Sequence, residues 1–184
     1  MPSTSVKTTR RLFFSLWPDD QVRSRLAHER LALAKEGAGR AMREDTLHLT
    51  LLFLGETPIA RLDEVMACGD AISVAPFDLK VDSAAYFPKL KIAYLGMAES
   101  PPALLDLQSD LRVRVASARF GFYDREFHPH ITAARNCQVI RSSRPVEPIE
   151  WHVDRFVLID SDLNPPAPLR GPVYTVLKSW LLRA

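Results

Sequence analysis

Hydrophobic and polar residues alternate along the chain with two different periods, which predict interleaved strands and helices. Short stretches in which apolar residues recur at every second position, or run on unbroken, are typical of strands. We therefore expect strands at residues 11–17, 47–53, 77–86, 92–97, 127–134, 151–159 and 173–181. Between some of them, apolar residues recur at helical spacing in three stripes. The stripes are Val22, Leu26 and Leu33; Ile59, Leu62, Val65, Met66 and Ile72; and Leu104, Leu107, Leu111 and Val115.

Each predicted helix begins at a capping signal. Asp19–Asp20 opens the first helix, which we expect to run to about Lys35. Thr57–Pro58 and Ser100–Pro101 each place a capping hydroxyl before a proline, whose missing N–H costs nothing in a first helical turn. Residues 164–172 are rich in proline, which cannot donate to a sheet ladder, and we expect a loop there.

The order of these elements repeats. A strand, a helix and a second strand carrying His-x-Thr occur at residues 12–50, and the same order returns at residues 92–132. Such a repeat predicts an α+β fold of two similar lobes with pseudo-twofold symmetry. Chance alternation of strands and helices is the alternative, and the two His-x-Thr units favour the repeat.

Length and composition indicate one soluble globular domain. The chain has 184 residues, of which 47% are hydrophobic and 25% charged. We expect a flexible polar segment at residues 1–10 and a single domain at residues 11–184. The first ten residues lack the apolar stretch of a secretory signal, and no apolar run approaches the roughly 18 residues of a membrane span. Cys68 and Cys137 are expected to be reduced thiols, so the sequence predicts a cytoplasmic protein.

The formal net charge of +2 argues against a protein that grips long duplex nucleic acid, because such proteins usually carry a strong basic excess. Cations occur instead in small groups, which suit a small anionic ligand or the end of a nucleic acid. For each residue taken alone, ordinary solvated surface is the alternative. The groups are Lys89 and Lys91; Arg112, Arg114 and Arg119; and Arg141 and Arg144.

The two His-x-Thr units are the strongest chemical signal. Side chains at i and i+2 of a strand point to the same face, so His48 and Thr50 would stand side by side, as would His130 and Thr132. Two such strands facing each other would line one cleft with two imidazoles and two hydroxyls. A structural histidine is commoner than a catalytic one, but two copies at matching places in a repeat favour catalysis.

This set of groups meets the needs of phosphodiester hydrolysis without a metal. In-line displacement needs a base on the attacking oxygen and an acid on the leaving oxygen. Histidine suits both roles because its ordinary pKa, roughly 6.5, lies near neutrality. Threonine hydroxyls can donate to the non-bridging phosphate oxygens, where negative charge is held. The approximate symmetry leaves open which histidine is the acid.

Metal binding is the other chemical interpretation of the histidines. His128-Pro129-His130 places two imidazoles at strand spacing, and His48 would be a third ligand. No nearby Asp, Glu or Cys completes an obvious set, and the paired threonines would have no role. We therefore expect neither a metal nor another cofactor.

Three segments carry a family resemblance. RLFFSLWPDD (residues 11–20), LHLTLLFLGE (residues 47–56) and FHPHITAAR (residues 127–135) resemble the signature regions of bacterial and archaeal RNA 2′,3′-cyclic phosphodiesterases. Those enzymes form part of the 2H phosphoesterase superfamily and were earlier described as 2′-5′ RNA ligases. The resemblance implies a bilobal α+β fold in which two antiparallel sheets, flanked by helices, enclose a central cleft. It also implies metal-independent hydrolysis of 2′,3′-cyclic phosphate RNA ends to 2′-phosphomonoesters.

The same resemblance implies roles for the residues of the paired motifs. His48 would be the general acid that protonates the leaving 3′-oxygen, and His130 would be the base that activates water. Thr50 and Thr132 would hold the phosphate.

Outside the paired motifs, the resemblance implies substrate contacts. Arg135 closes the second motif and would contact phosphate or stack on a base. Phe13 or Phe14 would provide a stacking surface, with a place in the core as the alternative. Ala133 stands where the family favours a larger aliphatic residue, a departure that removes no chemical group.

Two further functions stay open. The same site would support reversible 2′-5′ joining of RNA halves as a side activity. A non-catalytic RNA- or nucleotide-binding module on the same fold is the third function, but such a module would be free to lose a histidine or threonine, and all four are present. We expect a monomer that acts on RNA ends or nucleotides with a 2′,3′-cyclic phosphate, without a membrane partner.

Overall fold

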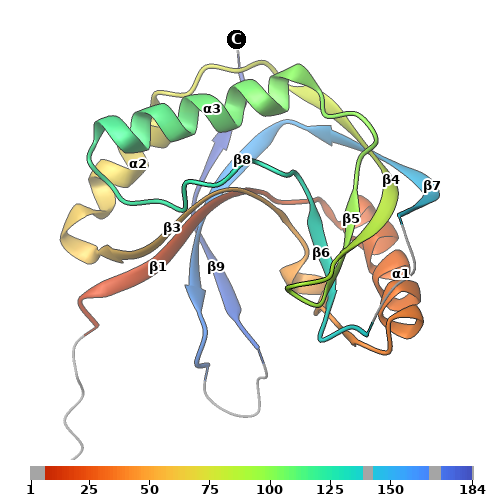
Figure 1. Cartoon of the computed structure of the whole chain (residues 1–184). Helices are drawn as coiled ribbons and strands as arrows, with labels where there is room; N and C mark the ends of the chain where they lie inside the picture. The colour runs from red at the N-terminus through yellow and green to blue at the C-terminus, as the bar shows by residue number, and fades with distance from the viewer. Residues whose placement is uncertain (1–6, 139–142, 166–170, 184) are drawn as a thin grey trace, which may run out of the picture.

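A computed structural model describes residues 7–138, 143–165 and 171–183. Its strands form one curved nine-stranded antiparallel sheet, and three α-helices pack against it (Figure 1). The strands are β1 (Thr9–Leu16), β2 (Arg40–Ala41), β3 (Leu49–Pro58), β4 (Phe77–Phe87), β5 (Ile92–Gly96), β6 (Ile131–Arg135), β7 (Arg144–Val153), β8 (Arg155–Asp162) and β9 (Val173–Leu181). The helices are α1 (Asp20–Glu36), α2 (Leu62–Asp70) and α3 (Pro102–Ser117), with 3₁₀ turns η1 (Glu44–Thr46) and η2 (Ile59–Arg61). The predicted α+β class is confirmed.

The sheet consists of two halves that meet at one point. The strand order is β7-β4-β5-β6-β3-β1-β8-β9, and β2 pairs with β6. Strands β6 and β3 are paired only through Leu49 and Ile131 in the described part of the chain. The two sheets expected from the sequence are therefore the two halves of one sheet, joined at this pair.

The predicted repeat appears as two strand–helix–strand units. Strands β1 and β3 are antiparallel neighbours connected through α1, and β5 and β6 are antiparallel neighbours connected through α3. Helices α1 and α3 each pack on the half that their own strands do not form. Helix α1 contacts β5, β6 and β7, whereas α3 contacts β3 and α2 (Figure 1).

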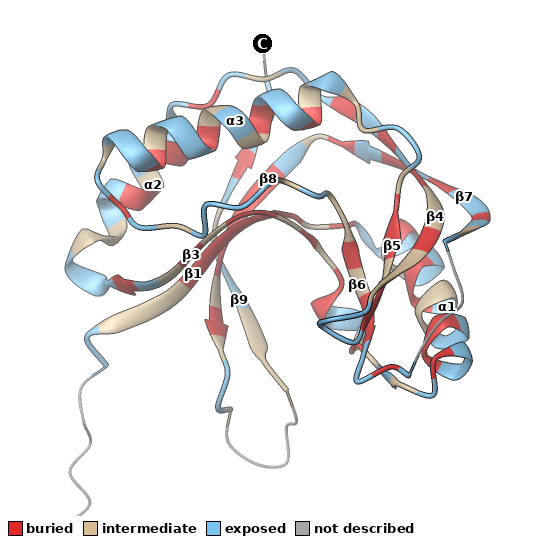
Figure 2. Cartoon of the chain, in the orientation of Figure 1, coloured by how far each residue is buried: buried red, intermediate tan, exposed pale blue. Residues whose placement is uncertain are grey.

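The two faces of the central strands have different surroundings. On β1, Leu12, Phe14 and Leu16 belong to the main core, which the helices cover. Phe13 points to the opposite face, where it packs with Val157 and other residues of a smaller cluster. Figure 2 shows that buried residues dominate β1 and β3. The main core, to which Leu49 and Ile131 belong, holds in place the strands that carry the His-x-Thr units.

Helix α1 follows its sequence signals. The Asp19 side chain accepts a hydrogen bond from the Val22 backbone N–H at 2.8 Å, and Gly37 ends the helix. Helix α3 begins at Pro102, one residue beyond the predicted Ser100–Pro101 signal, without a side-chain cap.

The predicted helix start at Thr57–Pro58 is wrong. Both residues end strand β3, where Pro58 pairs with Thr9 and Thr57 with Arg10. The Thr57 hydroxyl donates to the Gly55 carbonyl at 3.2 Å instead of capping a helix. Pairing with β1 extends the strand past this local signal, and α2 begins only at Leu62.

The single strand expected at residues 151–159 is also wrong. It is divided at Asp154 into the end of β7 and the start of β8, which lie in different halves of the sheet. The proline-containing segment before it belongs to β7, with Pro145 and Pro148 inside the strand. Strand β7 tolerates them because it lies at the edge of the sheet.

Several boundaries differ from the predictions. Strand β1 begins at Thr9, within the segment expected to be flexible, and Arg10 forms an ion pair with Asp160 at 2.8 Å. Residues 1–6, Arg141 and most of the expected loop at residues 164–172 lie outside the described residues.

Candidate active site

The two His-x-Thr units meet where the halves of the sheet join. Leu49 and Ile131, the middle residues of the units, are paired with each other and fully buried. The flanking side chains must therefore point to the opposite face. Because the pairing is antiparallel, His48 and Thr132 lie toward one end of this pair, and Thr50 and His130 lie toward the other. The charge of His130 acts on the pKa of His48, so the two units lie near each other.

Hydrogen bonds orient the His48 ring. Its Nδ1 lies 2.7 Å from the Thr46 carbonyl and its Nε2 lies 3.0 Å from the Thr50 hydroxyl oxygen. Because a carbonyl can only accept, Nδ1 carries a proton and donates. In the neutral ring, Nε2 then accepts from Thr50, as the i, i+2 spacing predicts. His48 and His130 each directly precede a strand instead of lying within it.

Aromatic rings surround His48 on several sides. Phe13 lies 4.9 Å from it between ring centroids, Trp17 is stacked at 5.9 Å, and Tyr174 makes an edge contact at 5.2 Å. This burial lowers the pKa of His48 from 6.5 to about 4, and the positive charges of His130 and other groups act in the same direction. His48 is therefore neutral at neutral pH in the unliganded protein.

His130 is held by an equivalent hydrogen bond. Its Nδ1 donates to the His128 carbonyl at 2.6 Å, so its Nε2 is also the available nitrogen. The rings of Phe87 and Tyr94 lie at 5.2 Å and 5.5 Å. Burial lowers the pKa of His130, and the charges of His128 and Arg135 lower it further. The pKa of both imidazoles is thus depressed in the free protein.

The charge around the site is positive. Arg135 is exposed at the end of β6, and its charge lowers the pKa of His48 and His130. Arg23 also acts on His48. Two neutral imidazoles, two hydroxyls and nearby guanidinium groups form a site suited to an anion, and a bound phosphate would restore part of the lost proton affinity.

Comparison with known proteins shows the family of the chain. A family model described as the 2′-5′ RNA ligase superfamily matches residues 18–165. The chain belongs to the 2′-5′ RNA ligase superfamily. Within it, the chain is 33% identical to an RNA 2′,3′-cyclic phosphodiesterase of Thermus thermophilus, over 94% of this chain and 90% of that protein. It is 32% identical to the protein of the same description from Escherichia coli, over 94% and 96%.

Solved structures of the superfamily share the fold. The crystal structure of E. coli LigT complexed with 3′-AMP has a TM-score of 0.85 and 30% identity, covering 95% of this chain and 98% of that one. LigT complexed with phosphate has a TM-score of 0.80 at 30% identity, covering 96% and 99%. The bilobal superfamily fold expected from the sequence is confirmed.

The structure separates Phe13 and Phe14, one of which was expected either to stack on substrate or to lie in the core. Phe14 is fully buried in the main core, where its ring lies 6.2 Å from Phe156 and 5.8 Å from Trp180. Phe13 lies on the face of the sheet opposite the main core but is only 3% exposed, and its ring packs against His48. Neither ring offers an open face, because alternation along β1 sends one into the core and His48 covers the other.

Three residues near His48 were missed by sequence reasoning. Arg23 of α1 donates to the backbone carbonyls of Pro18, Glu44 and Leu47, which ties the segment before His48 to the helix. Trp17 and Tyr174 enclose the imidazole. Trp17 directly follows the first strand, which was a usable signal. Tyr174 arrives from β9, far along the chain, with no local pattern to reveal it.

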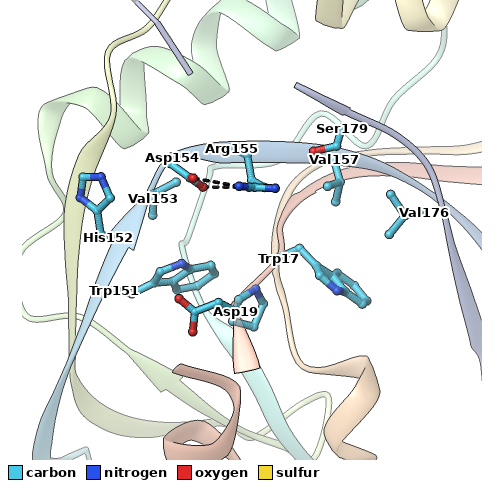
Figure 3. A pocket seen from close by; sticks show the side chains of 11 residues that line it. Trp17, Asp19, Trp151, His152, Val153, Asp154, Arg155, Val157, Val176 and Ser179 are labelled. Carbon is cyan, nitrogen blue, oxygen red and sulfur yellow. Dashed lines mark hydrogen bonds and ion pairs between the residues drawn. The ribbon is translucent and has the colours of Figure 1, made fainter. Parts of the chain in front are cut away.

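A cavity of about 530 Å³ adjoins the site through Trp17. Trp151, Val157 and Val176 contribute apolar walls (Figure 3). The Asp154 and Arg155 side chains, also along the cavity, form an ion pair at 2.9 Å. Trp17 is therefore shared between this cavity and the enclosure of His48.

Two other expectations concern metals and membranes. In residues 7–138, 143–165 and 171–183, no group of three or more His, Cys, Asp or Glu side chains is arranged to hold a metal ion. His128, considered as a ligand from the sequence, instead makes a 3.1 Å contact between its Nε2 and the Tyr94 hydroxyl. Over the same residues, no helix has the length and apolar character needed to cross a membrane.

Proposed function

We propose that this chain hydrolyses 2′,3′-cyclic phosphate ends of RNA to 2′-phosphomonoesters, without a metal. The observation that carries the proposal is the junction of the sheet halves, where pairing of Leu49 with Ile131 brings two imidazole–hydroxyl pairs to one face. Superfamily membership and curated relatives described as RNA 2′,3′-cyclic phosphodiesterases support the substrate class.

The proposed reaction is one in-line displacement at phosphorus. His130 Nε2 takes a proton from a water molecule while the water oxygen bonds to phosphorus. The bond from phosphorus to the 3′-oxygen breaks, and His48 Nε2 gives that oxygen a proton. The bond to the 2′-oxygen stays intact, so the product is a 2′-phosphomonoester with a free 3′-hydroxyl. Thr50 and Thr132 hold the non-bridging oxygens, and Arg135 offsets their charge.

The acid role of His48 needs an anion in the site. Its pKa of about 4 leaves it neutral in the free protein at neutral pH. A phosphate bound between the imidazoles stabilises the protonated form and raises that pKa. The protonated acid therefore accumulates in the substrate complex, and the hydrogen bond from Nδ1 to the Thr46 carbonyl stabilises the same form.

Activity measurements on single variants test this proposal. We expect His48→Ala and His130→Ala each to lower kcat on a 2′,3′-cyclic mononucleotide by about 10²–10⁴-fold, the usual contribution of a positioned proton transfer. EDTA should leave the wild-type rate unchanged. His28→Ala, an exposed position on α1, is the matched control and should retain full activity. Full activity in either active-site variant would refute the mechanism.

A better leaving group distinguishes the acid from the base. The phenolate of a 4-nitrophenyl phosphodiester leaves without a proton, so this substrate bypasses the general acid. On it, the defect of His48→Ala should shrink, while the defect of His130→Ala should remain. The reverse pattern would make His130 the acid and His48 the base.

The superfamily description favours 2′-5′ RNA joining as a second activity of the same site. A 5′-hydroxyl of another RNA would replace water as the attacking group, and the 3′-oxygen would again leave. We expect slow formation of a junction between tRNA halves that resists 3′-5′-specific nucleases. Its loss in His130→Ala would tie the activity to this site. Binding of cyclic phosphates with no turnover would instead favour the non-catalytic module.

A cytoplasmic monomer is the setting that we propose for this reaction. Cys68 and Cys137 are free and buried, as expected of reduced thiols. Sedimentation of the purified protein would test whether it is a monomer.

A further inference from the structure

Tyr174 lies close to His48 although it comes from the far edge of the sheet. Strand β9 is the last strand in the order and pairs with β8. From there the Tyr174 ring reaches back over the catalytic face and meets His48 edge-on, at 5.2 Å and 88°. It makes similar edge contacts with Phe13 at 5.2 Å and Trp17 at 6.4 Å. The phenol is thus held beside the imidazole by two further aromatic rings, those of Phe13 and Trp17.

The phenol lies in the same positive field as the imidazoles. Burial raises the pKa of Tyr174, and the charges of Arg135, Arg11 and Arg43 oppose that rise without overcoming it. The hydroxyl therefore keeps its proton at neutral pH and can donate it in a hydrogen bond. The charge of Arg135 also lowers the pKa of both histidines. One guanidinium therefore acts electrostatically on the phenol and on the two proposed proton-transfer groups.

We propose that Tyr174 is a further catalytic residue, whose hydroxyl donates a hydrogen bond to a non-bridging oxygen of the phosphoryl group beside His48. The inference rests on the proposed function. A donor held in place before the reaction stabilises charge that develops on those oxygens, at no cost in reorganisation. Thr50 lies within hydrogen-bond distance of His48 Nε2, so a donor from a separate strand adds to what the His-x-Thr units provide.

Removal of the hydroxyl alone tests the role. Tyr174→Phe keeps the ring that packs on His48 and Phe13 and removes only the donor. We expect kcat on a 2′,3′-cyclic mononucleotide to fall about 10–100-fold, below the effect of losing a principal oxyanion donor. The matched control is Tyr123→Phe. Tyr123 is 61% exposed and also contacts a phenylalanine of the sheet edge-on, Phe53 at 5.0 Å, so its hydroxyl should be dispensable.

Inorganic phosphate provides a second measurement that does not need turnover. Phosphate is titrated into the wild type and the Tyr174→Phe variant while the NMR signals of the His48 and His130 rings are followed. We expect phosphate affinity to fall about tenfold in the variant, since a hydrogen bond to a charged group is lost. The melting temperature of the variant should match that of Tyr123→Phe, which excludes a general loss of structure.

The two measurements separate failure of this inference from failure of the proposed function. If the wild type hydrolyses cyclic phosphates, an unchanged kcat in Tyr174→Phe overturns the role of Tyr174. If the wild type hydrolyses none, the proposed function fails, and the phosphate titration decides the role instead. In that case, an unchanged affinity of Tyr174→Phe for phosphate overturns the proposed role of Tyr174.

Discussion

The imidazole of each His-x-Thr unit is oriented by a hydrogen bond to the backbone two residues earlier. His48 donates from Nδ1 to the carbonyl of Thr46, and His130 donates to the carbonyl of His128, in both cases two residues earlier. The bond fixes the tautomer and leaves Nε2 for chemistry. Because this hydrogen bond is local, a short motif is sufficient to specify it, and the motif occurs twice in the sequence.

Acid should destabilise the fold through His48. Its pKa is 6.5 in the unfolded chain and about 4 in the folded one, where burial disfavours the charged ring. Between these values the unfolded state binds more protons, so the free energy of unfolding falls as the pH falls. This contribution is fully present above pH 6.5 and lost by about pH 4.

Urea unfolding across that pH range would measure the effect. His48→Gln should reduce the dependence of the unfolding free energy on pH, because the titrating group is gone. His28→Gln on the exposed face of α1 is the control and should keep the wild-type slope. An unchanged slope in His48→Gln would contradict the buried, neutral state of this histidine.

The aromatic surroundings of His48 were less predictable than the histidines. Phe13 and Phe14 are adjacent and of one type, and only the pairing of β1 decides that Phe14 enters the core while Phe13 supports His48. Tyr174 joins the site through the pairing of β9 with β8, a contact between distant parts of the chain. Local patterns carry no information on such contacts.

At the scale of elements, sequence signals predict the boundaries of helices and strands correctly where local hydrogen bonds determine them. They predict them wrongly where strand pairing determines them. Asp19 caps α1 as predicted because the cap bonds to the backbone three residues on. Thr57–Pro58 has the same local appearance, but pairing with β1 carries β3 through it. The break at Asp154 has a similar origin, since β7 and β8 belong to different halves of the sheet.

Arg23 connects helix α1 to the segment before His48, and its removal should slow catalysis. Its guanidinium donates to the carbonyls of Pro18, Glu44 and Leu47 and lies 5.0 Å from the Trp17 ring. Arg23→Met would leave these carbonyls without that donor and loosen the segment that leads to His48. We expect a fall in kcat of about tenfold, the effect of a small misplacement of a reacting group, with little change in KM.

The control for Arg23 is another cation of the same helix. Lys35→Met removes an exposed charge from the last turn of α1, away from these carbonyls, and should leave kcat unchanged. Steady-state kinetics on a cyclic mononucleotide would compare the two. Equal kcat values for both variants would show that the tether has no catalytic consequence.

At the scale of the whole molecule, the crossing of the helices makes the two halves interdependent. Helix α1 leaves β1 in one half and packs on β5, β6 and β7 in the other, while α3 leaves β5 and packs against β3. One hydrophobic cluster includes residues of both halves, such as Phe14 and Leu79. Helices α1 and α3 each cover the half that their flanking strands do not form, so the site at the junction depends on both halves.

The chain should therefore unfold in one step. The indole NMR signals of Trp151, in β7, and Trp180, in β9, report on opposite edges of the sheet. We expect both signals to disappear at one temperature. Leu107→Ala, at a fully buried position of α3, should lower that temperature equally for both, with a loss of about 2–5 kcal/mol. Leu105→Ala, 44% exposed on the same helix, should have a smaller effect. Two separate midpoints would mean that the halves fold independently and that the junction holding His48 and His130 can open while each half stays intact.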